Sequence, residues 1–454
     1  MKLDPDIKAS ISGIRGHWPD QLNVETTAGL AQAFVNTITT KSRPILIGHD
    51  ARPHSTKIHH IIISVLRGNN LEVIDIGLAP LPTTGIVTKK YDCAAGINVT
   101  ASHNPPPYHG IKFLDENGEF IDNHWLNQLL NNFDQLDPAD ISIDREFDFE
   151  ASFSRKAYDN HLALYSYDTI KQKVAVDAVN NSGSIIIPEL LDRLGCEVIE
   201  IACDPSDKPN REYEPNVKNL AKTAEKIKNL DCDFGIAVDP DADRLVLISP
   251  TKGVISEEYT LALAVWNMLL ENYRGDVVVN QSTSRLVDWV AEKFDRKVLR
   301  SAVGEQNVVS MMRTHSSIIG GEGNGGVIDG SRHYSRDSLS GIYHVLKLLT
   351  KKKMNLDEVI DTMPQLIMSK EKLDIKGLDV NKIYTELQSN LESILDLAEV
   401  DVEDGLRLVF KNNSWIHIRP SNTEPILRII GESKEIKTIK AIFDTVNNLL
   451  QPKQ

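Results

Sequence analysis

Short apolar runs alternate with amphipathic segments along most of this 454-residue chain. Five-residue runs such as Ala95–Val99 and Phe234–Val238 have the length of buried strands. Between such runs, apolar residues recur every three or four positions, as in the segment with Leu30, Phe34 and Ile38, which predicts helices. Asn23 precedes that segment and is expected to cap it. Strands that alternate with helices predict mainly parallel sheets with helices on both faces.

The alternation forms three successive units, and each unit leads an apolar run into an unusual loop. The last part of the chain differs, because residues 406–410 and 415–419 alternate as half-exposed strands and an amphipathic helix closes the chain. We therefore predict three α/β domains with parallel or mixed sheets, followed by a smaller α+β domain. The predicted boundaries are 1–150, 151–254, 255–368 and 369–454.

Composition limits the classes of function. The hydrophobic content of 41% and the charged content of 25% are ordinary for a soluble globular enzyme. The 50 basic and 64 acidic residues give a net charge of −14, which would repel DNA or RNA, so no nucleic-acid partner is expected. No apolar run approaches the length of a membrane span and the start carries no secretion segment, so we expect a cytoplasmic protein. The four cysteines form no C-x-x-C pair, which argues against a zinc site.

The first unusual loop follows the run that ends at Val99. Three consecutive prolines at 105–107 cannot continue a helix or a central strand, so a fixed loop that carries Ser102, His103 and Lys112 is expected. A serine held there can carry a phosphate if a metal and a proton acceptor lie close by. The alternative is a proline-rich surface turn with a capping serine.

The second loop contains Asp239, Asp241 and Asp243, which alternate directly after a buried run. Three carboxylates this close repel one another unless a cation lies among them, and oxygen ligands suit Mg²⁺ or Mn²⁺. A calcium EF-hand is excluded, because Arg244 stands where that loop needs glycine and Pro250 where it needs glutamate. An aspartyl phosphatase and a solvated acidic turn are the alternatives.

Three further segments offer groups for a phosphorylated ligand. Glu322 lies within the glycine-rich run 320–326 and would meet hydroxyl or amino donors, as on a sugar; a flexible hairpin is the alternative. Arg15, between two glycines, suggests a loop that presents a guanidinium, although a plain turn is also compatible. Near the C-terminus there is a cluster of donors that suits a phosphate or a polar surface turn, formed by Arg419, Ser421, Asn422, Thr423 and Arg428.

Taken together, these loops resemble those of the α-D-phosphohexomutase superfamily. The similar segments are Ser12-Gly13-Ile14-Arg15-Gly16, Thr100-Ala101-Ser102-His103-Asn104-Pro105, Asp239-Pro240-Asp241-Ala242-Asp243-Arg244, Gly321-Glu322-Gly323-Asn324-Gly325-Gly326 and Arg419-Pro420-Ser421-Asn422-Thr423-Glu424-Pro425. The resemblance spans nearly the whole chain and implies four domains around a central cleft.

The resemblance also implies roles for these residues. Ser102 would be a phosphoserine, and Mg²⁺ would be bound by Asp239, Asp241, Asp243 and a phosphate oxygen on Ser102. A phosphorylated hexose would be the substrate and a hexose 1,6-bisphosphate the intermediate and activator. Arg15 and Arg244 would neutralise charge, and Lys112 and His103 would transfer protons. The substrate-binding residues would be Glu322, Asn324, Arg419, Ser421, Asn422, Thr423 and Arg428.

Some positions depart from the family pattern. Many relatives end the sugar loop with Ser-Gly-His, whereas this chain has Asn324-Gly325-Gly326, and His333 is a candidate substitute for the missing histidine. His109 stands where asparagine is usual and His49 where arginine is common. The Gly-Asn-Gly-Gly variant is similar to the phosphoglucosamine mutase branch, so glucosamine 6-phosphate and glucosamine 1-phosphate are the expected pair.

Several alternatives stay open at this point. The chain could instead be a phosphomannomutase/phosphoglucomutase, a Mg²⁺-dependent sugar phosphatase, or a sugar-phosphate-binding protein without catalysis. The oligomeric state, monomer or homodimer, is not fixed by the sequence, nor is the residue that acts as general base.

Overall fold

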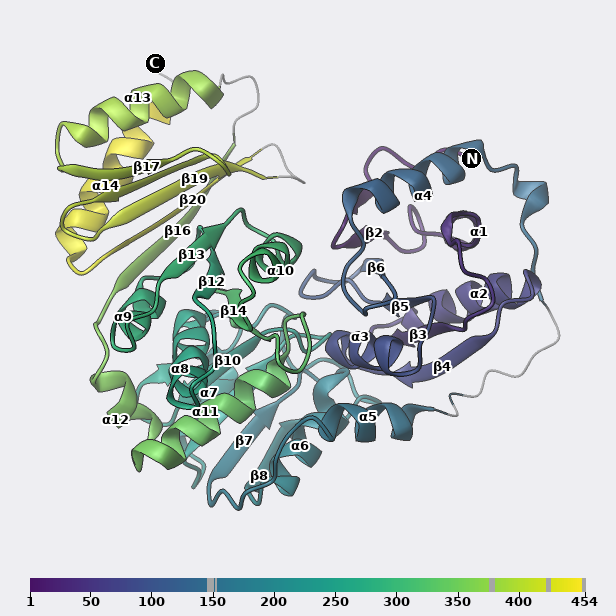
Figure 1. The fold of residues 1–454 in the computed structure, drawn as a ribbon, viewed down its shortest axis with the longest axis horizontal. Helices are drawn as coiled ribbons and strands as arrows, with labels where there is room; N and C mark the ends of the chain where they lie inside the picture. Colours follow the sequence, from purple (N-terminus) through teal and green to yellow (C-terminus); the bar gives the residue numbers. More distant parts are fainter. Residues whose placement is uncertain (145–150, 152, 375–379, 422–425, 451–454) are drawn as a thin grey trace.

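The computed structural model describes residues 1–144, 151, 153–374, 380–421 and 426–450. Figure 1 shows the first α/β unit on the right, the second and third below and to the left, and the C-terminal unit at the upper left. Within the described ranges, no helix combines the length and the apolar character needed to cross a membrane.

The first domain contains a six-stranded mixed sheet in the order β1-β2-β6-β5-β3-β4. Its parallel part is the predicted succession β3-α2-β4-α3-β5. As expected, Asn23 caps α1, because its side chain accepts a hydrogen bond from the Thr26 amide at 2.8 Å. The antiparallel strands β1, β2 and β6 were not expected from the sequence. The elements are β1 (Lys8–Ser10), β2 (Gly13–His17), α1 (Val24–Thr37), β3 (Ile45–His49), α2 (Ser55–Gly68), β4 (Val73–Leu78), α3 (Leu81–Lys90), β5 (Ala95–Val99), β6 (Tyr108–Leu114), α4 (Asn123–Gln135) and the 3-10 turn η1 (Pro138–Asp140).

The second domain repeats the α/β pattern around a five-stranded sheet in the order β11-β10-β9-β7-β8. Strands β7, β8 and β9 are parallel, and β10 returns antiparallel to β9 directly after the aspartate loop. The elements are α5 (Ser154–Leu162), β7 (Lys173–Asp177), α6 (Gly183–Arg193), β8 (Glu197–Ala202), α7 (Ala221–Lys228), β9 (Phe234–Val238), β10 (Leu245–Ser249) and β11 (Gly253–Val254).

The third domain has a four-stranded sheet in the order β13-β12-β14-β15. The glycine-rich run forms the tight connection between β14 and its antiparallel neighbour β15. The elements are α8 (Glu257–Leu270), β12 (Val277–Asn280), α9 (Leu286–Glu292), β13 (Val298–Ser301), α10 (Glu305–Thr314), β14 (Ile319–Glu322), β15 (Gly326–Asp329), α11 (Ser338–Lys352) and α12 (Leu356–Asp361).

The C-terminal domain is an antiparallel sheet in the order β16-β20-β19-β18-β17, with its two helices on one face (Figure 1). The strands predicted near residues 406–410 and 415–419 and the closing helix are all present. The elements are β16 (Ile367–Asp374), α13 (Val380–Glu392), β17 (Leu397–Asp401), β18 (Leu406–Phe410), β19 (Trp415–Pro420), β20 (Ile426–Ser433) and α14 (Ile436–Leu450).

The hydrophobic core consists of several separate clusters. One cluster runs through the second and third domains and reaches the first domain at residues such as Ile76 and Val87. The C-terminal domain has its own cluster, which includes Phe410, Ile416 and Val446. The first domain also has a large cluster of its own, which includes Phe34 and Phe113. Among the described residues, the second and third domains thus share one apolar cluster, whereas the first and the fourth domains each have a core of their own.

Candidate active site

Ser102 lies just beyond the end of β5, in an unusual backbone conformation. Its φ of 51° is in the left-handed region, which residues other than glycine seldom adopt. Two contacts hold this conformation: the Ser102 amide donates to Thr100 Oγ1 at 2.9 Å, and the Arg52 guanidinium donates to the Ser102 carbonyl. In this conformation Ser102 Oγ donates to Asp239 Oδ2 at 3.0 Å. The serine loop of the first domain therefore meets the aspartate loop of the second.

Lys112 does not lie on the serine loop, so that expectation was wrong. The chain re-enters the sheet at Tyr108, immediately after the prolines, and Lys112 pairs in register with Asn98 of β5. The prolines interrupt the chain only at the turn, and the buried residues Ile111 and Phe113 make the following segment a central strand. The strand carries the Lys112 side chain, 1% exposed, towards the aspartate loop.

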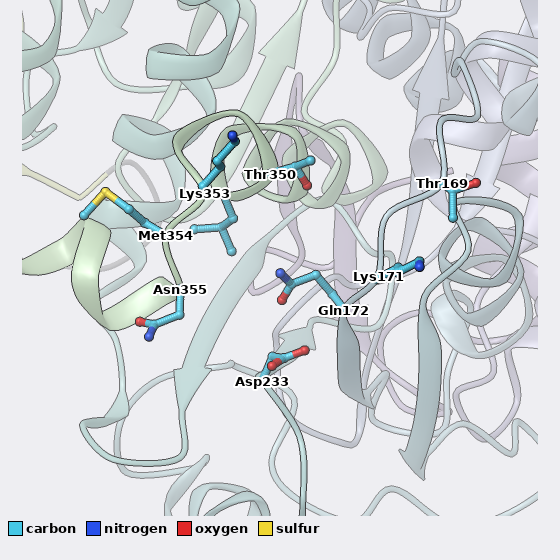
Figure 2. Close-up of a pocket in the computed structure, with 9 residues that line it drawn as sticks. Thr169, Lys171, Gln172, Asp233, Thr350, Lys353, Met354 and Asn355 are labelled. Carbon is cyan, nitrogen blue, oxygen red and sulfur yellow. The ribbon is translucent and has the colours of Figure 1, made fainter.

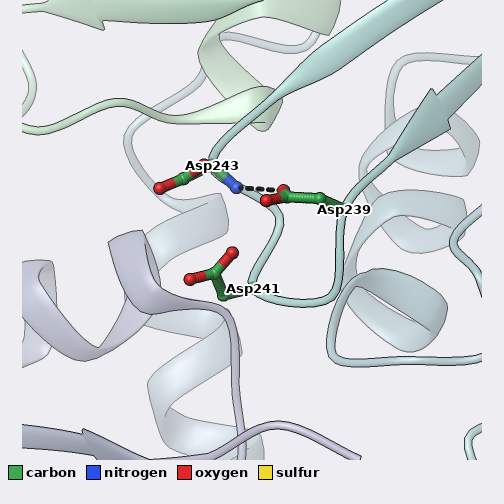
Figure 3. A group of neighbouring side chains, drawn as sticks. All are labelled: Asp239, Asp241 and Asp243. Carbon is green, nitrogen blue, oxygen red and sulfur yellow. Dashed lines mark hydrogen bonds between the residues drawn. The ribbon is translucent and has the colours of Figure 1, made fainter. Parts of the chain in front are cut away.

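Asp239, Asp241 and Asp243 form a buried cluster after β9 (Figure 3). One oxygen from each lies within 4.8 Å of the others. Asp239 Oδ1 accepts hydrogen bonds from the amides of Asp243 and Arg244, both at 3.2 Å. Burial and the charges of Asp241 and Asp243 raise the pKa of Asp239 well above its ordinary value. Because all three side chains are fully buried, the alternative of a solvated acidic turn is wrong.

The aspartate cluster fits a divalent cation. Oδ1 of Asp241 and Oδ1 of Asp243 are buried and have no hydrogen-bond partner in the described part of the chain. Buried carboxylate oxygens without partners are costly, and a hard cation with oxygen ligands would satisfy them. Together with Asp239, these oxygens form the donor set that Mg²⁺ prefers.

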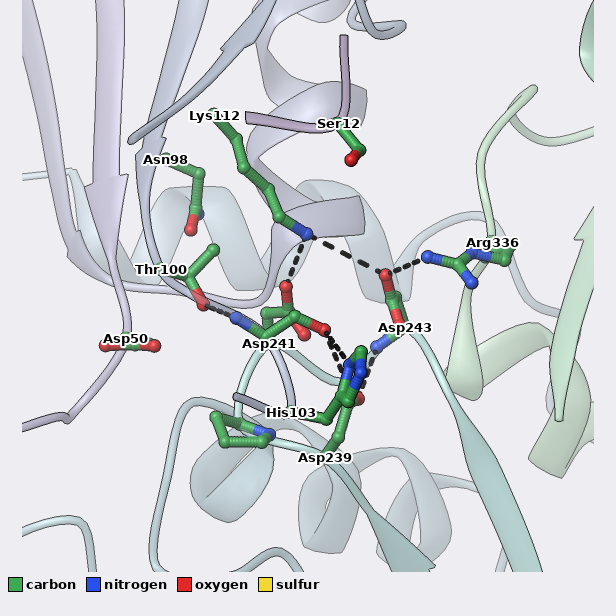
Figure 4. A network of polar contacts seen from close by, with 12 residues as sticks. Ser12, Asp50, Asn98, Thr100, His103, Lys112, Asp239, Asp241, Asp243 and Arg336 are labelled. Atoms are coloured by element: carbon green, nitrogen blue, oxygen red, sulfur yellow. Dashed lines mark hydrogen bonds and ion pairs between the residues drawn. The ribbon is translucent and has the colours of Figure 1, made fainter. Parts of the chain in front are cut away.

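Basic side chains surround the aspartate cluster (Figure 4). Lys112 Nζ lies 2.7 Å from Asp241 Oδ2 and 3.9 Å from Asp243 Oδ2. Arg336 Nη2 lies 2.6 Å from Asp243 Oδ2, and Arg244 Nε lies 3.8 Å from Asp243 Oδ1. Cations beside the aspartate cluster can neutralise the charge of a phosphoryl group that is transferred there.

Arg15 and His103 complete the surroundings of Ser102. Arg15 donates to Asn104 Oδ1 at 3.0 Å and to the Ser12 carbonyl at 3.2 Å. Burial lowers the pKa of Arg15, but a guanidinium stays charged in proteins. His103 Nδ1 lies 3.3 Å from Ser102 Oγ. Burial, assisted by the charges of Arg244 and Arg15, holds the pKa of His103 well below its ordinary value, so this imidazole is neutral.

The glycine-rich loop places Glu322 at the end of β14, where it is 3% exposed. Its Oε1 accepts hydrogen bonds from Asn280 Nδ2 at 2.7 Å and from the Gly304 amide at 3.0 Å. Its Oε2 accepts from Arg336 Nη1 at 2.9 Å. Asn324 is partly exposed, and its Oδ1 accepts from the Gly326 amide at 3.2 Å.

Gly326, where many relatives have histidine, has a steric explanation. A Cβ at this position would lie 2.3 Å from Cδ of Arg336, so the Arg336 side chain fills the space that a histidine would need. His333, the candidate substitute, is directed elsewhere: its Nε2 donates to the Gly118 carbonyl of the first domain at 3.1 Å. Burial lowers the pKa of His333 to about 4, so the ring is neutral in this contact.

Replacing His333 with glutamine should change how stability depends on pH. Because the folded-state pKa of about 4 lies below the ordinary value of 6.5, the unfolded chain binds a proton first as the pH falls. The contribution of His333 to stability is therefore complete above pH 6.5 and declines below it. Chemical unfolding at pH 7.5 and pH 5 should show the wild type losing about 2 kcal/mol relative to His333→Gln. A constant difference between the two proteins would contradict this assignment.

The expected phosphate-binding residues lie on the sheet of the C-terminal domain. Arg419 of β19 and Arg428 of β20 are paired in register, so the two guanidinium groups start from adjacent strands. Burial lowers the pKa of Arg419, and among the nearby charges Arg428 acts in the same direction. Ser421 follows β19, and its amide donates to the Ile426 carbonyl at 2.8 Å. Asn422 and Thr423 lie outside the described residues.

Two arginines of the site were not singled out from the sequence. Arg52 donates to Asp50 Oδ2 at 3.0 Å as well as to the Ser102 carbonyl, and its guanidinium stacks 4.1 Å from the ring centre of Tyr213 in the second domain. Arg52 lies in the polar loop that follows β3, and this position after a buried strand is the feature of the sequence that could have indicated it. Arg336 bridges Asp243, Glu322 and Glu305, which no local pattern indicates.

A pocket of about 480 Å³ lies away from this site, between the start of β7 and the end of α11 (Figure 2). It shares no residue with the serine, aspartate or glycine-rich loops. Its lining residues are Thr169, Lys171, Gln172, Asp233, Leu349, Thr350, Lys353, Met354 and Asn355. The candidate site is therefore defined by the convergence of loops and not by this pocket.

Sequence comparison identifies a family over almost the whole chain. Models of the phosphoglucomutase/phosphomannomutase family match in order: alpha/beta/alpha domain I at residues 7–140, domain II at 156–253, domain III at 256–366 and the C-terminal domain at 368–449. A phosphoglucomutase/phosphomannomutase from Thermococcus kodakarensis is 30% identical, with 97% of each chain covered. A phosphoglucosamine/phosphogalactosamine mutase from Sulfurisphaera tokodaii is 28% identical, with 97% of this chain and 98% of the relative covered.

Solved structures show the same fold. A phosphoglucomutase/phosphomannomutase family protein from Burkholderia thailandensis has a TM-score of 0.84 at 21% identity, covering 100% of this chain and 99% of the other. Parafusin, a phosphoglucomutase from Paramecium, has a TM-score of 0.79 at 19% identity, covering 100% and 97%. The fold class expected from the sequence, three α/β domains and a smaller C-terminal α+β domain, is confirmed.

Proposed function

The chain belongs to the phosphoglucomutase/phosphomannomutase family, and from this premise we propose that it transfers phosphate between the 1- and 6-positions of a hexose. It is an enzyme of the isomerase class, an intramolecular phosphotransferase. One observation carries the proposal: Ser102 Oγ, held in a strained loop, lies 3.0 Å from a buried cluster of three aspartates. A serine in that position can accept and return a phosphoryl group.

Asp239, Asp241 and Asp243 would hold Mg²⁺, with an oxygen of the phosphate on Ser102. The metal would supply charge neutralisation to the phosphate. Lys112, Arg15 and Arg244 add positive charge around the same position. Positioning and charge neutralisation are the main requirements of phosphoryl transfer.

In the first half-reaction, a sugar hydroxyl attacks the phosphorus of phosphoserine 102. The new oxygen–phosphorus bond joins the phosphate to the sugar, the bond from Ser102 Oγ breaks, and the hydroxyl proton ultimately reaches Ser102 Oγ. His103, 3.3 Å from Oγ, and Lys112 are the candidates to transfer it. The product is a hexose 1,6-bisphosphate.

The second half-reaction is the reverse with the other phosphate. The bisphosphate must turn over so that its second phosphate faces Ser102. Arg419, Ser421, Asn422, Thr423 and Arg428 would bind the phosphate that is not being transferred, in either orientation. Glu322 and Asn324 would contact the sugar hydroxyls.

Glucosamine 6-phosphate and glucosamine 1-phosphate are the proposed pair. The support is the Gly-Asn-Gly-Gly form of the sugar loop, in which the close approach of Arg336 explains the glycine at position 326. The names of the relatives point in two directions, to glucose and mannose or to amino sugars. Phosphomannomutase/phosphoglucomutase activity is therefore the second candidate.

A coupled assay tests the substrate. Purified protein with Mg²⁺ and a trace of hexose 1,6-bisphosphate is given glucosamine, glucose and mannose phosphates, and kcat/KM is compared. We expect the highest kcat/KM for the glucosamine ester. Equal or better use of glucose or mannose phosphate would overturn this substrate and favour the second candidate.

A further inference from the structure

The C-terminal domain contacts the third domain mainly through polar side chains. Its apolar cluster does not extend across the boundary within the described residues. Instead, Asp404, Arg407, His417 and Glu432 make hydrogen bonds to two loops of the third domain, at 281–285 and at Val303. Asn280 and Gly304, which adjoin these two loops, both donate hydrogen bonds to Glu322 Oε1.

One route runs from Asp404 to Glu322. Asp404 Oδ2 accepts a hydrogen bond from the Val303 amide at 2.8 Å. The next residue, Gly304, donates its amide to Glu322 Oε1 at 3.0 Å. Gly304 has a φ of 126°, which side-chain-bearing residues rarely adopt, so the shape of this loop is specific. Asp404 therefore holds the amide of Val303, and the next amide along the chain, that of Gly304, donates to Glu322.

A second route runs from His417 to Glu322. His417 Nε2 faces the Asp404 carbonyl at 2.7 Å, and because a carbonyl only accepts, Nε2 carries the proton. His417 Nδ1 therefore accepts from Ser282 Oγ at 2.8 Å. The Ser282 amide donates to Asn280 Oδ1 at 2.9 Å, which orients the Asn280 side chain so that Nδ2 donates to Glu322 Oε1.

The phosphate-binding arginine lies next to both routes. His417 and Arg419 are two positions apart on β19, so their side chains are on the same face of the sheet. The charges of Asp404 and Glu322 both act on the pKa of Arg419, which places its guanidinium near these carboxylates. Arg419, the residue proposed to bind phosphate, thus lies on the same strand as His417, which contacts Ser282 in the second route.

We propose that Asp404 and His417 are positioning residues: docking of the C-terminal domain through them sets the Glu322 carboxylate, which couples phosphate binding to sugar recognition. This inference rests on the proposed function, in which Arg419 contacts the phosphate and Glu322 the sugar. Neither positioning residue is expected to touch the substrate.

A double-mutant cycle tests the coupling. Asp404→Ala and His417→Leu remove the two routes, and each is made in the wild-type and the Glu322→Gln backgrounds. Asp404→Asn is the conservative control, because its amide oxygen can still accept from Val303. Trp415→Phe is the control near the interface, because it removes the hydrogen bond from Nε1 to Glu432 Oε1, which lies outside both routes, and keeps a buried aromatic ring beside Arg407.

We expect Asp404→Ala and His417→Leu to lower kcat/KM about 10-fold in the wild-type background and at most about twofold when Glu322 is glutamine. Asp404→Asn and Trp415→Phe should stay within about twofold of wild type in both backgrounds. Equal losses in the two backgrounds, or no loss in the wild-type background, would overturn the proposal.

Amide hydrogen exchange gives a readout that does not depend on activity. In Asp404→Ala, the Gly304 amide should exchange faster than in wild type, and in Asp404→Asn it should not. If the wild type isomerises none of the three sugar phosphates, the proposed function fails, while exchange still decides the positioning role. Unchanged exchange at Gly304 in Asp404→Ala would refute that role.

Discussion

Ser102→Ala should abolish isomerisation while the protein stays folded. The substitution removes the only atom that could carry the phosphoryl group in the proposed reaction, so kcat should fall by at least about 10,000-fold. The side chain is small, and its polar contacts are with Asp239 and His103, so its removal should leave the hydrophobic core intact. Coupled kinetics measure the loss of turnover. Intact-mass spectrometry after incubation with hexose 1,6-bisphosphate measures the loss of phosphorylation.

Ser64→Ala is a suitable control, because Ser64 lies on α2 and its Oγ donates to the His60 carbonyl of the same helix. The control should keep wild-type turnover and gain one phosphate in the mass spectrum. The Ser102 variant should show neither. Near-normal turnover in Ser102→Ala would mean that phosphate does not pass through this serine.

Asp239→Asn should weaken metal binding strongly without unfolding the protein. Asparagine keeps an oxygen where Asp239 Oδ1 accepts the amides of Asp243 and Arg244, so the loop should retain its shape. It removes one of three negative charges from the proposed ligand set. Because loss of groups that only support metal ligands already reduces affinity about 10- to 100-fold, loss of a ligand charge should cost at least about 100-fold.

Titration with Mn²⁺, followed by electron paramagnetic resonance, measures this affinity directly. Asp288→Asn provides the matched control, since Asp288 pairs with Arg300 in the third domain and lies outside the aspartate cluster. The control should bind Mn²⁺ like wild type. If Asp239→Asn binds Mn²⁺ equally well, the three aspartates are not the metal site.

Local patterns in the sequence were sufficient to single out the loops that the fold brings together. An apolar run that ends in a polar or glycine-rich segment is visible without any tertiary information, and it marked Ser102, Asp239 and Glu322. The strands that precede these residues are β5, β9 and β14. Asn23 and the closing helix were predicted on the same local basis.

Residues that reach the site through tertiary packing were not predictable in this way. Arg336 joins Asp243 to Glu322 just before α11, whose first residue, Ser338, donates to the Ala242 carbonyl of the aspartate loop. No spacing in the sequence indicates that contact. Arg52 reaches the Ser102 carbonyl across neighbouring strands. Lys112 was predicted on a loop because three consecutive prolines argue against a strand, whereas β6 begins directly after them. The roles of Asn422 and Thr423 stay predictions from the sequence.

A sugar phosphatase could use the same metal site. In that reaction water, and not a sugar hydroxyl, accepts the phosphate. The two reactions differ in where the phosphate goes and not in which residues bind it. The resemblance to mutases over nearly the full chain favours transfer to a sugar hydroxyl. Product analysis therefore discriminates better than any variant of the aspartate cluster.

The most direct test follows both products in one sample by phosphorus NMR. The protein, Mg²⁺ and a trace of hexose 1,6-bisphosphate are incubated with glucosamine 6-phosphate, and with the glucose and mannose esters in parallel. The account predicts that at least one 6-phosphate is converted to its 1-phosphate until the two reach equilibrium, with little inorganic phosphate. Stoichiometric release of inorganic phosphate, or no 1-phosphate from any of the three sugars, would contradict it.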